Sequence, residues 1–199
     1  MKKDFVYLAS ASPRRSELLR QIGVRFTVRA AAIPEECLPG ETPDNYVVRL
    51  AAAKAEAVWA AVPGAAPVLG ADTAVVLDGE ILGKPESGAE ALRMLERLSG
   101  RSHRVLTAVA VRHDGGTETR LSVSEVRFRA TTAAERLAYC ATGEPFDKAG
   151  GYGIQGHAAV FIEELDGSYS GVAGLPLYET AALLARCGVD FWLTARAQA

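Results

Sequence analysis

The chain has 199 residues, of which 49% are hydrophobic and 23% are charged, a balance typical of globular proteins. Its 22 Lys and Arg residues nearly match its 24 Asp and Glu residues, so the net charge of -2 argues against a protein that grips long nucleic acid. Cys37, Cys140 and Cys187 have no metal-binding spacing, and no apolar run is long enough to cross a bilayer. We therefore expect a soluble, cytoplasmic protein with no nucleic-acid or membrane partner.

The first half of the chain predicts short strands mixed with two helices. Ser12 and Pro13 mark one helix start, because serine caps helices well and proline fits the first helical position. Asp44 is expected to cap the second helix. The expected strands are 5–9, 26–28, 68–77 and 80–82, and the expected helices run from 13 to a stop at Gly23 and from 44 to about 62.

The second half predicts longer strands and two helices that start with capping boxes, Ser87 with Glu90 and Thr132 with Glu135. The expected strands are 103–112, 119–128, 159–164 and 191–193, the expected helices end near 98, 141 and 184, and residues 148–157 form a glycine-rich loop. Strands and helices do not alternate strictly, and no linker divides the chain. These features predict one domain over residues 1–199 with a mixed α/β or α+β fold.

The segment Ser12-Pro13-Arg14-Arg15 is the first candidate for chemistry. A helix N-terminus offers free backbone N–H groups and a positive dipole end, and the two arginines add fork-shaped donors. Together these groups describe a phosphate site. The alternative is a capped surface helix whose arginines are solvated.

Asp72 lies in Gly70-Ala71-Asp72-Thr73, inside an otherwise apolar strand. A buried aspartate is costly unless paired, so we expect it at an interruption or end of that strand, facing a cleft where it binds a hard metal or activates water. The alternative is an aspartate that caps neighbouring backbone. Lys54 falls on the apolar stripe of its helix and either extends outward to solvent or points at a buried anion.

Two further motifs resemble nucleotide-binding signatures and lack their context. Gly83-Lys84-Pro85 has proline where a P-loop needs Ser or Thr, but Lys84 remains a candidate phosphate ligand. Residues 151–156 fit GxGxxG, yet a polar loop precedes them and a strand-like stretch at 158–162 follows, which excludes a dinucleotide fold. Gln155 in this stretch has an amide that suits a base edge, unless the glycines only make a tight connection. His103 is expected to have a structural hydrogen-bonding role.

Six motifs in order resemble the Maf family of nucleoside triphosphate pyrophosphatases, over a match from Leu8 to about Leu184. They are Leu-Ala-Ser-x-Ser-Pro-Arg-Arg, Gly-Ala-Asp-Thr, Gly-Lys-Pro, Ser-Gly-x-x-His-x-Val-x-Thr, Lys-Ala-Gly-Gly-Tyr-Gly-Ile-Gln-Gly and Gly-Ser-Tyr…Gly-Leu-Pro. The resemblance implies an elongated mixed sheet flanked by helices, with two lobes around a central cleft. It also implies cleavage between the α and β phosphates of a nucleoside triphosphate, a divalent cation such as Mg²⁺ or Mn²⁺, and a homodimer.

The resemblance also implies a role for individual residues. Asp72 matches the proton acceptor, and Glu35 matches a carboxylate that binds the metal together with Asp72. The base-selecting positions match Arg14, Thr73 and Gln155, and the phosphate-facing positions match Ser12, Arg15, Lys54 and Lys84.

The motifs resemble the dTTP/UTP branch of the family more than the 7-methyl-GTP branch, which departs at several of these positions. Pro34 stands where an acidic residue is frequent, which bears on the metal site beside Glu35. Gly171 and Ala173 replace more usual Asn and Val, a difference of packing. A nucleotide-binding regulator of cell division without enzymatic activity is the alternative from another class.

Overall fold

One mixed sheet of seven strands organises the computed structural model, which describes residues 5–62, 64 and 66–192. The strand order is β2-β1-β3-β5-β6-β7, with β4 also paired to β3. β1 runs parallel to β2 and β3, and the other pairs are antiparallel. The strands are β1 (Val6–Leu8), β2 (Phe26–Val28), β3 (Val68–Leu77), β4 (Glu80–Leu82), β5 (Ser102–His113), β6 (Gly116–Phe128) and β7 (Ile162–Asp166).

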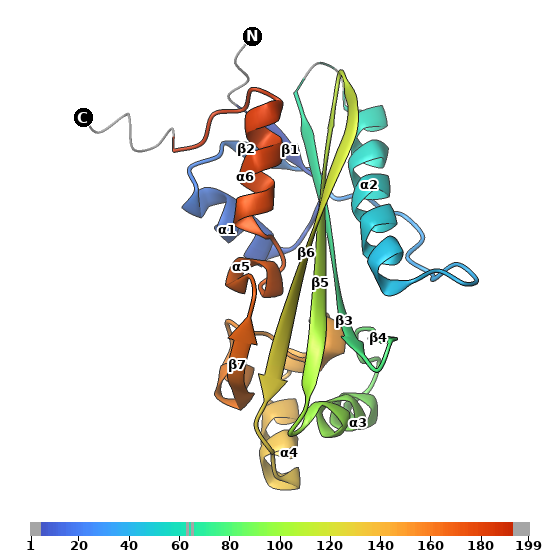
Figure 1. Cartoon of the computed structure of the whole chain (residues 1–199), viewed down its shortest axis with the longest axis vertical. Helices are drawn as coiled ribbons and strands as arrows, with labels where there is room; N and C mark the ends of the chain where they lie inside the picture. Colours follow the sequence, from blue (N-terminus) through green and yellow to red (C-terminus); the bar gives the residue numbers. More distant parts are fainter. Residues whose placement is uncertain (1–4, 63, 65, 193–199) are drawn as a thin grey trace.

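Helices cover both faces of this sheet (Figure 1). They are α1 (Pro13–Gln21), α2 (Pro43–Ala61), α3 (Gly88–Leu98), α4 (Ala133–Ala141), α5 (Tyr169–Val172) and α6 (Leu177–Arg186), with 3₁₀ turns at Glu144–Asp147, Ala149–Gly151 and His157–Phe161. The apolar stripe of α2, which includes Val47 and Leu50, is fully buried, and its alanines pack on one face of the sheet. α1 and α6 bury their leucines against the opposite face.

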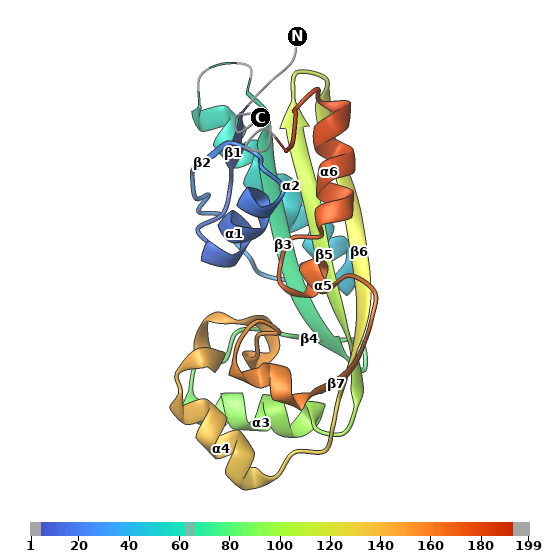
Figure 2. The ribbon, with the colours of Figure 1, turned by 90° about the vertical axis from the view of Figure 1, so that its left-hand side faces the viewer.

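The molecule is elongated and has two lobes (Figure 2). One lobe holds α1, α2 and α6, and the other holds α3, α4 and the 3₁₀ turns around a core that includes Leu95, Phe128 and Tyr139. The long strands β3, β5 and β6 connect the two lobes, which confirms the expected mixed α/β architecture. In the described part of the chain, no helix combines the length and apolar character that crossing a membrane requires.

The outer edge of β3 is open in its middle. β1 pairs with β3 at Val68 and Leu69, and β4 pairs with it from Val75 onward. Between these partners, the stretch Gly70–Ala74 has no strand beside it on that edge among the described residues, although β5 pairs along the other edge. The expected interruption at Gly70–Thr73 is therefore wrong for the strand, which is continuous. What is interrupted is the pairing on one edge.

Two helix starts differ from the sequence prediction. Thr42 caps α2 in place of Asp44, and its hydroxyl accepts a hydrogen bond from the Asn45 N–H at 3.3 Å. Proline fits the first helical position, so Pro43 sets the cap one residue before itself. The capping box predicted at the start of α3 is half formed. The Ser87 hydroxyl accepts a hydrogen bond from the Glu90 N–H, but the Glu90 carboxylate accepts from the Glu86 N–H and not from the Ser87 N–H. The Thr132–Glu135 capping box is confirmed.

Of two further predicted strands, the one at 159–164 starts later than expected, and the one at 191–193 is not formed over its described residues. Residues 157–161 form a 3₁₀ turn, so β7 begins only at Ile162. Ala158 and Phe161 are both buried, and their spacing of three residues is the period of a 3₁₀ helix. Phe191 and Trp192 form no strand, because Trp192 has a φ of 65° and its N–H donates to the Ile22 carbonyl. Leu193 lies outside the described residues.

Candidate active site

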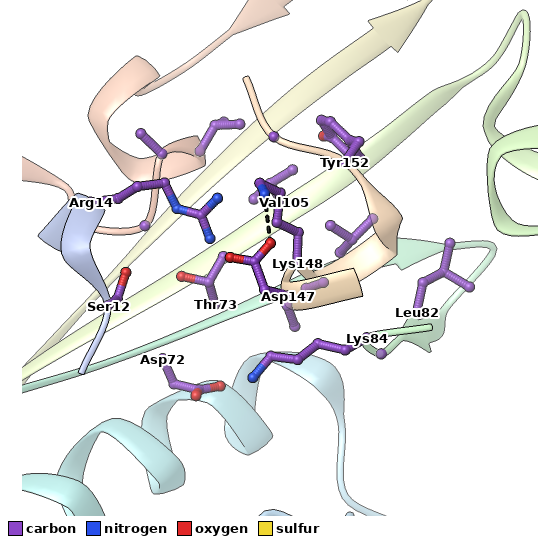
Figure 3. Close-up of a pocket in the computed structure, with 18 of the residues that line it drawn as sticks. Ser12, Arg14, Asp72, Thr73, Leu82, Lys84, Val105, Asp147, Lys148 and Tyr152 are labelled. Atoms are coloured by element: carbon purple, nitrogen blue, oxygen red, sulfur yellow. Dashed lines mark hydrogen bonds and ion pairs between the residues drawn. The ribbon is translucent and has the colours of Figure 1, made fainter. Parts of the chain in front are cut away.

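A cleft of about 540 Å³ lies between the lobes, at the open edge of β3. Its lining combines α1, α2 and β3 from one side with the β4–α3 connection and the glycine-rich loop from the other (Figure 3). All nine residues that the sequence predicted for the site line this one cleft: Ser12, Arg14, Arg15, Glu35, Lys54, Asp72, Thr73, Lys84 and Gln155. Their assembly is thus observed, and their individual roles remain predictions.

Asp72 and Glu35 meet at the ammonium group of Lys54. The Lys54 Nζ lies 2.7 Å from Asp72 Oδ1 and 2.6 Å from Glu35 Oε1. The Lys54 and Asp72 side chains are only 11% and 10% exposed, whereas that of Glu35 is 49% exposed. Of the two alternatives for Lys54, the structure therefore selects the buried anion. Asp72 lies in the middle of β3, not at its end, and reaches the cleft because the edge there is open.

A glycine sets the distance between Lys54 and Asp72. A Cβ placed on Gly70 would lie 2.2 Å from the Ala51 carbonyl oxygen and 2.8 Å from the Ala55 amide nitrogen, so any side chain there would push α2 away from β3. Gly70 is two residues before Asp72 and shares its face of the strand. The glycine of the Gly-Ala-Asp-Thr motif thus lets the helix approach closely enough to form the ion pair.

The two carboxylates differ in their protonation behaviour. Burial raises the pKa of Asp72 above its usual value, and the charge of Lys54 offsets only part of this effect. Burial acts in the same direction on Glu35, but the Lys54 hydrogen bond and charge outweigh it and hold the pKa of Glu35 below its usual value. Asp72 is therefore the stronger base of the pair, and Glu35 is the more firmly ionised.

Arg15 is braced by protein groups at three of its donors. Its Nε donates to the Gly174 carbonyl at 2.8 Å, its Nη1 to Ser10 Oγ at 3.0 Å and its Nη2 to Thr73 Oγ1 at 3.2 Å. Because guanidinium has five N–H donors, two remain for a ligand. Arg15 thus combines a cleft position with a fixed orientation.

Thr73 continues this network into the sheet. Its hydroxyl lies 3.0 Å from Thr107 Oγ1, and the Thr107 hydroxyl lies 2.8 Å from the Gly171 carbonyl oxygen, which can only accept. Thr107 must therefore donate to Gly171, which makes Thr73 the donor to Thr107 and the acceptor from Arg15. Both hydroxyls are committed to holding the guanidinium, a role that the base-selecting prediction for Thr73 did not include.

Several predicted residues keep their polar groups available for a ligand. Ser12 has the backbone conformation of a helix N-cap, but its hydroxyl makes no capping bond. Arg14 and Lys84 have no hydrogen-bond or ion-pair partner among the residues that the structure describes, and both extend into the cleft (Figure 3). Gln155 is exposed on the cleft wall. The solvated-surface alternative is therefore wrong for Arg15, whose guanidinium is held by protein groups, and stays open for Arg14.

Sequence reasoning missed three charged residues that line the cleft: Glu86, and Asp147 and Lys148 next to Arg14. Only Lys148 had a signal in the sequence, because it is the first residue of the predicted glycine-rich loop. His103 was predicted correctly as structural: it is buried, and its Nε2 lies 2.6 Å from the hydroxyl of the buried Tyr152.

Asp72 and Glu35 form a donor set that fits a hard divalent cation. Among the described residues, no three His, Cys, Asp or Glu side chains gather in a metal-binding group. Mg²⁺, however, is commonly held by one or two carboxylates, with phosphates and water completing its octahedron. Two carboxylates that converge on one ammonium group meet this requirement when a triphosphate is present. Pro34, next to Glu35, is exposed and has no side-chain oxygen that could add a metal ligand to Asp72 and Glu35.

The fold and the cleft define a phosphohydrolase: basic side chains surround a partly occluded carboxylate at the edge of a sheet, where an anionic ester or anhydride fits. The family model described as Maf-like protein matches residues 5–187, and the chain belongs to this family.

Curated relatives cover nearly the whole chain. Proteins from Cupriavidus pinatubonensis and Burkholderia pseudomallei, both named dTTP/UTP pyrophosphatase, are 54% and 56% identical to it. The matches cover 94% of this chain in both cases, and 99% and 95% of the relatives. A solved structure, the Ham1 protein of Staphylococcus aureus, is 16% identical with a TM-score of 0.46 over 62% of this chain and 71% of that one.

Proposed function

We propose that the protein hydrolyses UTP and dTTP, and modified pyrimidine triphosphates, to the nucleoside monophosphate and pyrophosphate. The observation that carries this proposal is the ion pair of the buried Asp72 and Lys54, joined by Glu35, in a cleft that basic side chains surround. The relatives named dTTP/UTP pyrophosphatase support both the reaction and the substrates.

The cleft's own residues bind and orient the triphosphate. Lys84 is an available cation on one lobe, and Arg15 offers two further donors from a fixed position on the other. Ser12 adds a hydroxyl and the N-terminus of α1, where a helix stabilises negative charge. Donors fixed before the substrate arrives need no reorganisation as charge develops on the phosphoryl groups.

Asp72 is the group suited to deprotonate the attacking water. Its raised pKa makes it a better base than an ordinary aspartate, while Lys54 keeps its carboxylate oriented. A proton from water passes to Asp72 as water attacks the anhydride, and pyrophosphate leaves. A Mg²⁺ or Mn²⁺ ion held by Asp72 and Glu35 would supply Lewis-acid polarisation of the phosphate oxygens.

Release of pyrophosphate from UTP and dTTP tests this proposal. Asp72→Asn keeps the shape of the side chain and removes the base, so we expect kcat to fall by about 100-fold or more. Asp44→Asn is the matched control, because Asp44 is also an ion-paired aspartate, bonded to Arg104 at 3.0 Å outside the cleft. Full activity of Asp72→Asn, or an equal loss in both variants, would contradict the assignment.

A ranking of triphosphates by kcat/KM separates this proposal from a preference for another base, such as 7-methyl-GTP. The non-enzymatic regulator of cell division is the second alternative, and a division phenotype that a folded, hydrolytically inactive variant retains would favour it. The homodimer and the cytoplasmic location remain predictions.

A further inference from the structure

Arg14, Asp147 and Lys148 form a charged group that the proposed mechanism does not use. Lys148 Nζ lies 2.5 Å from Asp147 Oδ1 and 2.8 Å from the Glu144 carbonyl oxygen. A Cβ placed on Gly153 would lie 2.7 Å from Lys148 Cε and 3.5 Å from Arg14 Nη1, so both cations converge at this glycine. Figure 3 shows the three side chains on one side of Thr73, with Asp72 and Lys84 on the other.

Protein contacts hold Lys148 of this group in place. The Lys148 side chain is 13% exposed, and the carbonyl that it contacts belongs to Glu144, whose carboxylate accepts hydrogen bonds from the His157 amide at 2.8 Å and the Tyr139 hydroxyl at 3.0 Å. The Asp147 side chain, in contrast, is 71% exposed toward the cleft. The arrangement therefore presents an oriented carboxylate whose lysine partner is fixed.

Asp147 cannot be a phosphate ligand. Although partial burial opposes it, the Lys148 hydrogen bond lowers the pKa of Asp147, so the carboxylate is ionised and repels phosphate oxygens. An ionised carboxylate only accepts hydrogen bonds, so a substrate group that Asp147 binds directly must be a donor. A pyrimidine nucleoside triphosphate with its phosphates ionised offers donors only on its base and its sugar.

The neighbours of Asp147 favour the base. Lys148 uses two of its three N–H donors on protein groups, and Arg14 uses none on the described residues, so a donor is available on each cation. The group thus offers donor, acceptor and donor. The edge of uracil and thymine presents the complement: the O2 acceptor, the N3–H donor and the O4 acceptor. Apolar side chains such as Leu82 and Val105 line the same cleft and suit the faces of a planar base.

We propose that Asp147 accepts the N3–H of uracil or thymine while Lys148 and Arg14 donate to the flanking carbonyls, so that this group selects these bases over cytosine. The inference rests on the proposed function for its substrate class. In cytosine, N3 is an acceptor and would face the Asp147 carboxylate directly, which leaves both groups without a donor.

Binding of uncleavable nucleotides tests the inference separately from catalysis. Titration calorimetry with the α,β-imido analogues of UTP and CTP gives their Kd ratio for the wild-type protein and for Asp147→Asn. The amide has the size of the carboxylate but adds an N–H that donates to cytosine N3. We expect the preference for uracil to fall by about tenfold or more in this variant.

Glu86→Gln is the matched control, since Glu86 is an acidic residue at the cleft that does not belong to the group. It is expected to change the affinity for both analogues alike and leave the ratio unaltered. An unchanged ratio in Asp147→Asn would overturn the inference. The inference would also be overturned if Asp147→Asn lost only the discrimination between the UTP analogue and its 3′-deoxy form, because Asp147 would then contact the sugar and not the base. A wild-type protein that prefers the uracil analogue but releases no pyrophosphate from UTP would contradict the proposed function and leave this inference standing.

Discussion

Replacing Lys54 with methionine removes the shared partner of Asp72 and Glu35. Glu35 is half exposed and can turn to water, but Asp72 is 10% exposed and remains buried without its ion-pair partner. Removing one partner of a buried ion pair costs about 3–5 kcal/mol. For a chain of this size, 1 kcal/mol corresponds to about 2–4 °C in Tm, so we expect Tm to fall by about 6–20 °C near neutral pH.

The sign of the pH dependence follows from the raised pKa of Asp72. A carboxyl group whose pKa is higher in the folded state binds its proton more tightly there, so its contribution to stability is present at low pH and lost as pH rises through the folded pKa. Without Lys54 the pKa of Asp72 rises further, which makes this loss larger. The destabilisation in Lys54→Met should therefore shrink on acidification.

Urea unfolding of wild type, Lys54→Met and Lys54→Arg, each at about pH 8 and about pH 5, measures both effects. Lys54→Arg keeps the positive charge and should lose much less stability than Lys54→Met. Adding Asp72→Asn to Lys54→Met should recover part of the loss, because the buried charge is gone. The reasoning is refuted if Lys54→Met is as stable as Lys54→Arg near pH 8, or if its loss is the same at both pH values.

Further predictions concern the geometry and the chemistry of the cleft. Gly70→Ala places a Cβ against the Ala51 carbonyl, so urea unfolding should show a loss of about 1–3 kcal/mol, and pyrophosphate release should fall with it; wild-type stability would contradict the close approach. Thr107→Val breaks the hydroxyl chain that holds Arg15 and should lower kcat/KM by about tenfold, while Thr107→Ser keeps the hydroxyl and most of the activity; equal losses in both would indicate a packing effect. Because burial raises the pKa of Asp72, NMR titration of this side chain in the protein without added metal should give a pKa above the usual aspartate value of about 3.9, and a pKa at or below that value would contradict a strengthened base at this position. Chelation of divalent cations should abolish pyrophosphate release and leave Tm unchanged within about 2 °C, and added Mg²⁺ or Mn²⁺ should restore it; activity that survives exhaustive chelation would exclude the metal.

Local signals predicted most of the secondary structure, and they failed where the chain's path depends on distant contacts. The caps, hairpin glycines and apolar periodicities gave the long strands and the helices. The apolar run at 157–161 was ambiguous because its length suits either a strand or a turn, and only the burial of Ala158 and Phe161 settles its period. The positive φ of Trp192 arises from its contact with Ile22, which no local pattern announces.

For the site, the chemistry-bearing residues were predictable and their relations were not. A lysine on an apolar stripe and an aspartate in an apolar strand were both anomalies, and the structure shows that each explains the other. The open edge of β3 depends on where β1 and β4 stop pairing, which the sequence of β3 alone does not encode. Asp147 was missed because a lone carboxylate in a loop has no distinguishing pattern until its neighbours are known.

The break in pairing along β3 also bears on how the protein avoids self-association. An exposed strand edge is a template on which another chain can add a strand. Here the stretch without a partner strand, Gly70–Ala74, is short, is bounded by β1 and β4, is almost entirely buried and carries the charged Asp72 at the cleft. A strand from another chain therefore cannot pair with this stretch. Part of the β3 edge thus has no partner strand among the described residues and still presents no surface there for aggregation.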